Sequence, residues 1–458
     1  MAMYILDQYR GTTLSCRYEI PPRLAPAESR TQLEQAVKVA VVDTIMRHPM
    51  LQVGMTDATS KTPSWIQLPS LDLTQHLKWA HVVGHEDFEQ KIQEAFCAQL
   101  DDRFPDLSLE QPGWAMTIFR QGNAPIMETL LTWNHTQFDG AGAKVFHEDF
   151  LELLNNEDEA YERPGLDGDI LRLPQEPPLL PIPIERLKTW CPIRSSPYKT
   201  QFRVFSIDDA SLLAILALCR QNKTTITGLI NGLALIAFSS HLDSKAAPAF
   251  QSSTVMDHRR NLPPAPPDAP WGRSDRAVAN YVTQAPHKYD NDLVARIRSK
   301  LPKEEGRAVL SADLQRELWA ASAQTRREIV SRLEAGLRND LVGVFKFVTD
   351  WQKTMRDMAK RKRQLSWLVT NIGVLEGGGD GSRSDHGDDV LQRWSIGRAQ
   401  FGLSAETPAA AIEFSPVSVA GRGMWVGANW HDCAVDVTLG ERIMADMERW
   451  LNQLASQS

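Results

Sequence analysis

The pattern of apolar and polar side chains along the chain predicts strands and helices in alternation. Between Leu14 and Ile20, apolar residues alternate with polar ones, as in a strand with one buried face. Apolar residues at helical spacing between 33 and 45 predict a helix that ends before Pro49. Further helices are predicted at 88–100, 145–154, 210–219, 225–238 and 440–454, with a largely helical stretch at 290–360, and strands at 115–119, 127–134, 201–207, 251–256, 366–370, 394–403, 409–414 and 424–430. This order of elements predicts an α/β fold with mixed sheets.

Prolines gather near the middle of the chain. Six of them lie between Leu171 and Ser196. Such a segment cannot form a helix interior or a central strand, so it predicts an extended crossover between domains. A chain of 458 residues is also too long for one ordinary core. We therefore expect an N-terminal subdomain at 1–180, a linker at 181–200 and a C-terminal subdomain at 201–458.

The overall composition narrows the class of protein. Its 42% apolar and 23% charged residues are typical of a globular protein, and a net charge of −7 argues against nucleic acid as a partner. The five cysteines show no C-x-x-C spacing, which indicates a reducing compartment and neither disulfides nor zinc. No apolar stretch is long enough to span a bilayer, and the first ten residues lack a signal-peptide core. These features predict a cytoplasmic protein without a membrane span.

The most informative segment runs from Leu130 to Gly140. An apolar run typical of a buried strand ends at His135, and Asp139 and Gly140 follow before apolar residues resume at helical spacing. Of the eleven histidines, only His135 has an aspartate four positions later. Histidine suits proton transfer near neutral pH, and the end of a strand fixes its direction. The alternative is a histidine satisfied by hydrogen bonds, with Asp139 as the cap of the next helix.

The spacing resembles the His-x-x-x-Asp-Gly motif of the chloramphenicol acetyltransferase-like acyltransferase superfamily. That superfamily includes the plant BAHD acyltransferases, alcohol acetyltransferases and the condensation domains of nonribosomal peptide synthetases. The Asp-Phe-Gly-Trp-Gly segment of the BAHD branch has no counterpart here, since Gly421–Gly427 occupies its neighbourhood without the pattern. The chain is therefore more similar to the alcohol acetyltransferase and condensation branches. Four further segments resemble the superfamily in the same order: Arg47–Leu51 (R-H-P-x-L), Pro112–Trp114 (P-x-W), Asp257–Leu262 (N/D-x-R-x-x-L) and Thr370–Gly373 (S/T-N-x-G).

The resemblance implies a fold and an activity. The fold would be two chloramphenicol acetyltransferase-like subdomains with mixed sheets and an active site in a tunnel at their interface. The activity would be transfer of an acyl group from acyl-coenzyme A, as a co-substrate, to a hydroxyl or amine of a small molecule in secondary metabolism. His135 would be the general base, without an acyl-enzyme. No bound cofactor and no metal are expected, because no second ligand stands at metal-site spacing to His135.

The remaining site residues follow from the same resemblance. Asp139 would be structural and would pair with Arg259, with Arg260 as the fallback, because a buried carboxylate needs compensation. Gly140 would permit a backbone conformation closed to other residues and leave room for the ligand. Thr370 and Asn371 are candidates for contacts to the oxyanion or the acyl group. The alternative for this pair is a polar cluster that closes the end of a sheet.

Other assignments stay open at this point. The donor could instead be an acyl group on a carrier protein, as in condensation domains, or the fold could be a scaffold that cyclises one substrate. The basic stretch Arg356–Arg363 could attract coenzyme A phosphates or an acidic carrier, although a solvated helix end is the commoner explanation. His147 and Glu148 are expected on a solvated face of the motif helix. His258 is expected at the surface, with a place at the interface beside Arg259 as the alternative. The glycine-rich stretch 376–389 is expected to be a surface loop.

Overall fold

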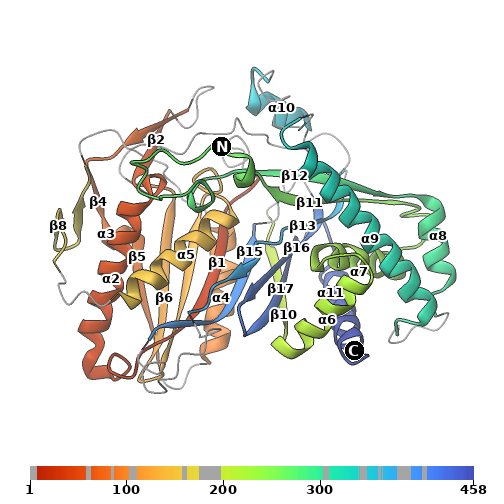
Figure 1. Cartoon of the computed structure of the whole chain (residues 1–458), viewed down its shortest axis with the longest axis horizontal. Coiled ribbons are helices and arrows are strands. Elements are labelled where there is room, and N and C mark those ends of the chain that lie inside the picture. Colours follow the sequence, from red (N-terminus) through yellow and green to blue (C-terminus); the bar gives the residue numbers. More distant parts are fainter. Residues whose placement is uncertain are drawn as a thin grey trace.

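The computed structural model places two sheets side by side, each with its own helices (Figure 1). The expected linker falls largely outside the described residues, as do Cys191, most of the glycine-rich stretch and the centre of the basic stretch. The described residues are 8–57, 63–83, 87–102, 111–156, 162–174, 198–302, 309–338, 340, 348–358, 363, 365–378, 393–404 and 410–457.

Within the described residues the first sheet has five strands in the order β15-β1-β7-β6-β5. All neighbours are antiparallel except β5 and β6. Leu131 of β7 points into the core beneath two helices, α2 and α5, whereas its neighbour Leu130 packs with α4 on the other face. The elements are β1 (Thr12–Glu19), β5 (Leu77–Val82), β6 (Trp114–Gln121), β7 (Ile126–Trp133), β15 (Ser395–Leu403), α2 (Arg30–Arg47), α4 (Phe88–Asp101) and α5 (Gly140–Asn155).

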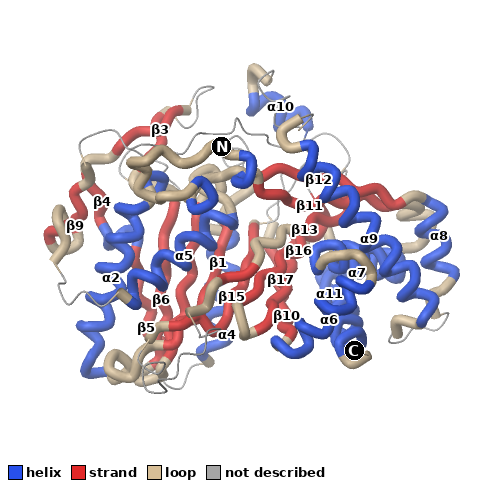
Figure 2. Tube along the Cα trace, in the orientation of Figure 1, coloured by secondary structure: helices blue, strands red, loops and turns tan. Residues whose placement is uncertain are grey.

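The second sheet runs β10-β17-β16-β13-β11-β12, with β14 beside β16. A separate apolar core lies between this sheet and its helices, which Figure 2 shows gathered on one side. The strands are β10 (Thr200–Ile207), β11 (Phe250–Asp257), β12 (Val282–Tyr289), β13 (Leu365–Val369), β14 (Val374–Leu375), β16 (Ala410–Val419) and β17 (Gly423–His431). These helices are α6 (Asp209–Gln221), α7 (Ile226–His241), α8 (Asn291–Ser299), α9 (Ala312–Ala335) and α11 (Val437–Ala455). The short helix α10 (Trp351–Met358) lies apart from them in Figure 2, and its Met355 belongs to the apolar core of the first half.

Short elements decorate the two halves. Two small sheets lie at the edge of the first half, and 3-10 turns follow α2 and β11. None of the helices in the described ranges is long and apolar enough to cross a membrane. The short elements are α3 (Leu73–His76), β2 (Val53–Thr56), β3 (Ser64–Gln67), β4 (Ser70–Asp72), β8 (Leu166–Asp167), β9 (Ile170–Arg172), η1 (Ala27–Ser29), η2 (Pro49–Leu51), η3 (Arg259–Asn261) and η4 (Ser274–Arg276).

The predicted α/β class with two mixed-sheet subdomains is confirmed. The division at 1–180 and 201–458 stays a prediction, and one strand departs from it. β15 comes from the second half of the sequence but pairs with β1 as the edge of the first sheet, where Figure 1 shows it in blue beside the red strand. Ala399, Phe401 and Leu403 of β15 therefore belong to the core of the first subdomain.

Candidate active site

His135 stands two residues beyond the end of β7, in a short loop held by its neighbours. Trp133 donates from its indole Nε1 to the carbonyl of Phe138 (2.7 Å), and Asn134 Oδ1 accepts from the backbone N–H of Thr136 (3.0 Å). These bonds close a tight turn around the histidine. The ring of His135 is half-buried and meets Tyr9 edge-on, with 5.7 Å between ring centroids.

Asp139 is fully buried and points both carboxylate oxygens at donors. Arg259 binds it with two hydrogen bonds, Nη2 to Oδ1 (2.8 Å) and Nη1 to Oδ2 (3.0 Å). The backbone N–H of Gly142 donates to Oδ1 (2.8 Å), so Asp139 also caps α5. Burial alone would lower the pKa of Arg259, but Asp139 and Asp257 raise it, so the guanidinium stays charged in the interior. The ion pair expected between Asp139 and Arg259 is present. Asp139 also forms the helix cap that belonged to the alternative interpretation of the His135 loop.

A short segment of the second half, which we call the strap (Ala277–Tyr281), binds the motif loop. The backbone N–H of Tyr281 donates to Asp139 Oδ2 (2.6 Å), and the backbone N–H of Asp139 donates to the carbonyl of Ala279 (3.2 Å). Arg259 donates to the carbonyls of Ala277 and Ala279. The strap therefore fixes the motif loop against the second subdomain through main-chain bonds.

One strap residue reaches His135 itself. Asn280 Nδ2 lies 2.7 Å from His135 Nδ1 and donates to the carbonyl oxygen of His135 (2.5 Å). Sequence reasoning missed Asn280, because it lies between a proline-rich loop and a strand without any motif. Only the tertiary fold brings it across 145 positions to His135.

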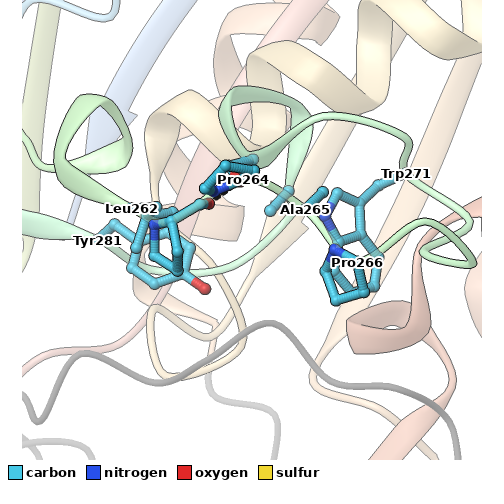
Figure 3. A pocket seen from close by; sticks show the side chains of 9 residues that line it. Leu262, Pro264, Ala265, Pro266, Trp271 and Tyr281 are labelled. Carbon is cyan, nitrogen blue, oxygen red and sulfur yellow. Dashed lines mark hydrogen bonds between the residues drawn. The ribbon is translucent and has the colours of Figure 1, made fainter.

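The outer side of the strap borders a shallow, open recess. Figure 3 shows Leu262 and Tyr281 at one end and Pro266 and Trp271 at the other. The guanidinium of Arg259 lies 5.2 Å from the centre of the Tyr281 ring. The side chain of Tyr281 thus holds the strap from one side while its backbone N–H binds Asp139.

Gly140 lies where the two halves touch. A Cβ atom at this position would stand 2.7 Å from Ile372 Cγ2 and 3.0 Å from Phe401 Cζ. Ile372 belongs to the Thr370–Gly373 segment, so this segment borders the first turn of α5. Gly140 therefore permits close packing of the motif against the second half. The expected special backbone conformation was wrong, because Gly140 is the first residue of α5 and has no positive φ.

We expect Gly140→Ala to destabilise the protein by about 1–3 kcal/mol, because the added methyl group overpacks this junction. Urea unfolding of the variant and the parent measures the difference. The double variant Gly140→Ala, Ile372→Ala should be destabilised by less than the sum of the two single changes, since the smaller side chain makes room. Strict additivity would contradict the contact.

Thr370 and Asn371 follow β13 but differ in their bonding. Asn371 Nδ2 donates to Thr227 Oγ1 (3.1 Å), and Asn371 Oδ1 accepts from the backbone N–H of Gly373 (2.8 Å). Thr370 is buried, and its Oγ1 has no hydrogen-bond partner among the described residues. Asn371 therefore shapes the turn, whereas the Thr370 hydroxyl is the better candidate for a ligand contact. That His135 faces these residues stays a prediction.

The other motif segments serve packing around α5. His48 Nε2 bonds Asp149 Oδ2 (2.7 Å), and Arg276 of the second half also pairs with Asp149. Burial lowers the pKa of His48, although its bond to Asp149 opposes the shift. Trp114 donates from Nε1 to the carbonyl of Leu51 (3.1 Å), which joins the P-x-W segment to the R-H-P-x-L segment.

The expectation of a surface position for three residues was wrong. His147 is fully buried on α5 beneath β1, where Tyr18 meets its Nδ1 (2.9 Å), and burial lowers the pKa of His147 to about 3. Glu148 is nearly buried and pairs with Arg276 (2.6 Å). His258 is buried, and its Nε2 lies 3.3 Å from Asp340 Oδ2.

Among the residues that the structure describes, no group of three His, Cys, Asp or Glu is placed to hold a metal ion.

Comparison with solved structures identifies the fold. The TRI3 trichothecene 15-O-acetyltransferase from Fusarium sporotrichioides superposes with a TM-score of 0.68 over 99% of this chain and 93% of that chain, at 13% identity. The condensation domain of the Monacolin K polyketide synthase MokA superposes with a TM-score of 0.58 over 99% and 95%, at 8% identity. The chain thus has the chloramphenicol acetyltransferase-like fold, as its motifs predicted.

One curated relative resembles the chain in sequence. The probable alcohol acetyltransferase FCK4 of Fusarium pseudograminearum is 22% identical over 92% of this chain and 86% of its own length. No protein-family model matches the chain. The resemblance to the acyltransferase superfamily therefore holds over nearly the whole sequence, well beyond the six-residue motif.

Proposed function

We propose that the protein is an acyltransferase that moves an acyl group from acyl-coenzyme A to a hydroxyl group of a small molecule. The observation that carries the proposal is the His135 loop, which the Asp139–Arg259 pair and the strap hold at the junction of the two subdomains. The names of FCK4 and TRI3, an alcohol acetyltransferase and an O-acetyltransferase, favour a hydroxyl over an amine as the acceptor.

In the proposed reaction His135 acts as the general base. It takes the proton of the acceptor hydroxyl as the oxygen attacks the thioester carbonyl. A C–O bond forms, the C–S bond breaks, and His135 returns the proton to the leaving thiolate of coenzyme A. No acyl-enzyme is needed. The Thr370 hydroxyl would donate to the oxyanion of the tetrahedral intermediate.

The proposal is tested with purified protein, a panel of acyl-coenzyme A donors and a panel of hydroxylated small molecules that includes a trichothecene with a free 15-hydroxyl. Release of free thiol and the acylated product in a mass spectrum are measured together. We expect product with at least one pair. Absence of product with every pair would overturn the proposal of a coenzyme A donor.

A second candidate donor is an acyl group on a carrier protein, because several solved structures of this fold are condensation domains. Turnover with free acyl-coenzyme A in the absence of any carrier separates the two. Product that forms only with an acylated carrier would favour this second candidate.

We expect Thr370→Val to lower kcat roughly 10²–10³-fold, as the loss of an oxyanion donor does. Stability should change little, because the hydroxyl has no hydrogen-bond partner among the described residues. Thr325→Val is the matched control, since its buried hydroxyl bonds Tyr289 (3.1 Å) in the core of the second subdomain. That control should lose stability and keep kcat. An unchanged kcat in Thr370→Val would remove Thr370 from the site.

A further inference from the structure

The strap follows α5 in the opposite direction to the helix. Its last residue, Tyr281, binds Asp139 just before the helix begins. Ala279 lies against the first turn, since a Cβ atom on Gly142 would stand 3.3 Å from the carbonyl oxygen of Ala279. The end of the strap that holds the motif loop therefore lies beside the first turn of α5.

Arg276, which directly precedes the strap, attaches its other end to the middle of the same helix. Its Nη1 lies 2.6 Å from Glu148 Oε2, and its Nη2 binds Asp149 Oδ1. The two carboxylate side chains are only 8% and 4% exposed, so salt screens these ion pairs less than it screens pairs at the surface. Arg276 belongs to the second half of the chain and both acids belong to the first. The ion pairs therefore fix the start of the strap across the junction of the two halves.

The two carboxylates do not depend on Arg276 alone. Glu148 also pairs with Lys144 (3.3 Å). Asp149 also binds Nε2 of His48 (2.7 Å). Removal of the Arg276 guanidinium therefore leaves each carboxylate with another partner, and the severe cost of a buried charge without compensation does not arise. The main loss is the connection between the strap and α5.

We propose that Arg276 is a positioning residue, which holds the strap against α5 and so keeps the motif loop in the arrangement that the reaction needs. This inference rests on the proposed function, since the motif loop carries the base His135. Arg276 binds two acids of α5, so its effect on the loop passes through the main-chain bonds between the strap and Asp139. A small displacement of a catalytic group is enough to slow a reaction strongly.

Hydrogen exchange of the full chain without substrate, measured by mass spectrometry, reads the strap directly. In Arg276→Met the backbone amides of 277–281 should exchange about 3–30-fold faster than in the parent, because the strap opens more easily. Arg276→Lys should recover part of the protection, since an ammonium group can still pair with one carboxylate. Arg422→Met is the matched control, because Arg422 also pairs across the two halves, with Glu19 (3.0 Å), at the far end of β1 from the His135 loop. It should leave the exchange of the strap unchanged.

Thiol release from the acyl-coenzyme A and acceptor pair that gives product supplies the kinetic arm. Arg276→Met should lower kcat about 3–30-fold and change KM less than about twofold, because a misplaced base slows the chemical step more than binding. Arg276→Lys should have an intermediate kcat, and Arg422→Met should keep the parent value.

Three results would overturn the inference: unchanged exchange of the strap in Arg276→Met, faster exchange with an unaltered kcat, or an equal loss of kcat in Arg422→Met. Full activity of His135→Ala would refute the proposed function instead. It would leave the exchange measurement, which needs no substrate, as it stands.

Discussion

Replacement of His135 by alanine is expected to abolish acyl transfer and to leave the protein folded. His135 is half-buried in a loop and contributes no side chain to the apolar cores of the described structure, so its removal opens little space. General-base catalysis contributes roughly 10²–10⁴-fold to a rate, and the loss should be of that size. Thiol release and product mass are measured alongside circular dichroism and urea unfolding of the variant.

The control for this variant is His81→Ala, at a surface histidine whose side chain is 36% exposed. That change should leave turnover unaltered. Turnover of His135→Ala above about a tenth of the parent value would contradict a general-base role. It would instead favour a scaffold that shapes its substrate without proton transfer by His135.

The second large effect concerns the buried pair of Asp139 and Arg259. Replacing Arg259 by methionine leaves the Asp139 carboxylate uncompensated in the interior, and the free energy of unfolding should fall by about 3–5 kcal/mol. Asp139→Leu leaves the buried Arg259 guanidinium with the partly exposed Asp257 as its ion-pair partner among the described residues. It also removes the cap of α5, which adds about 1 kcal/mol. The double variant should lose less free energy of unfolding than the two single variants lose together, because neither buried charge of the pair remains. Denaturant unfolding of all four proteins completes the cycle.

A solvent-exposed pair of the same two residue types supplies the control. Arg273 and Asp275 form an ion pair with side chains 73% and 53% exposed. Asp275→Ala should change stability by less than about 1 kcal/mol, as is usual for surface pairs. If Asp139→Leu cost no more free energy of unfolding than Asp275→Ala, the Asp139–Arg259 pair would not be the structural link between the motif loop and η3.

Local sequence patterns were enough to predict much of this fold. Alternation and helical spacing give the strands and helices of both sheets, and a five-residue spacing leads to His135. The pair of Asp139 and Arg259 could also be predicted across 120 positions, because each residue belongs to a motif of the same superfamily. A contact between two residues that both belong to motifs could therefore be predicted even where they lie far apart in the sequence.

Contacts without a motif could not be predicted. β12 was missed because Pro286 interrupts its pattern, yet an edge strand tolerates a proline. His147 was placed at the surface because helical spacing does not reveal which face of α5 meets β1. Asn280 has no local signature at all. Each of these residues takes its role from a partner that only the tertiary structure brings near.

Because β15 comes late in the sequence but completes the first sheet, this sheet cannot finish folding early in synthesis. A ribosome releases residues 12–133, with β1, β6 and β7, long before it reaches Leu403. Until then β1 keeps an open edge, and the core beside it lacks Phe401. Unpaired strand edges attract other chains, so the growing polypeptide is vulnerable to aggregation for most of its synthesis. The first subdomain to be translated is thus among the last parts of the molecule to be completed.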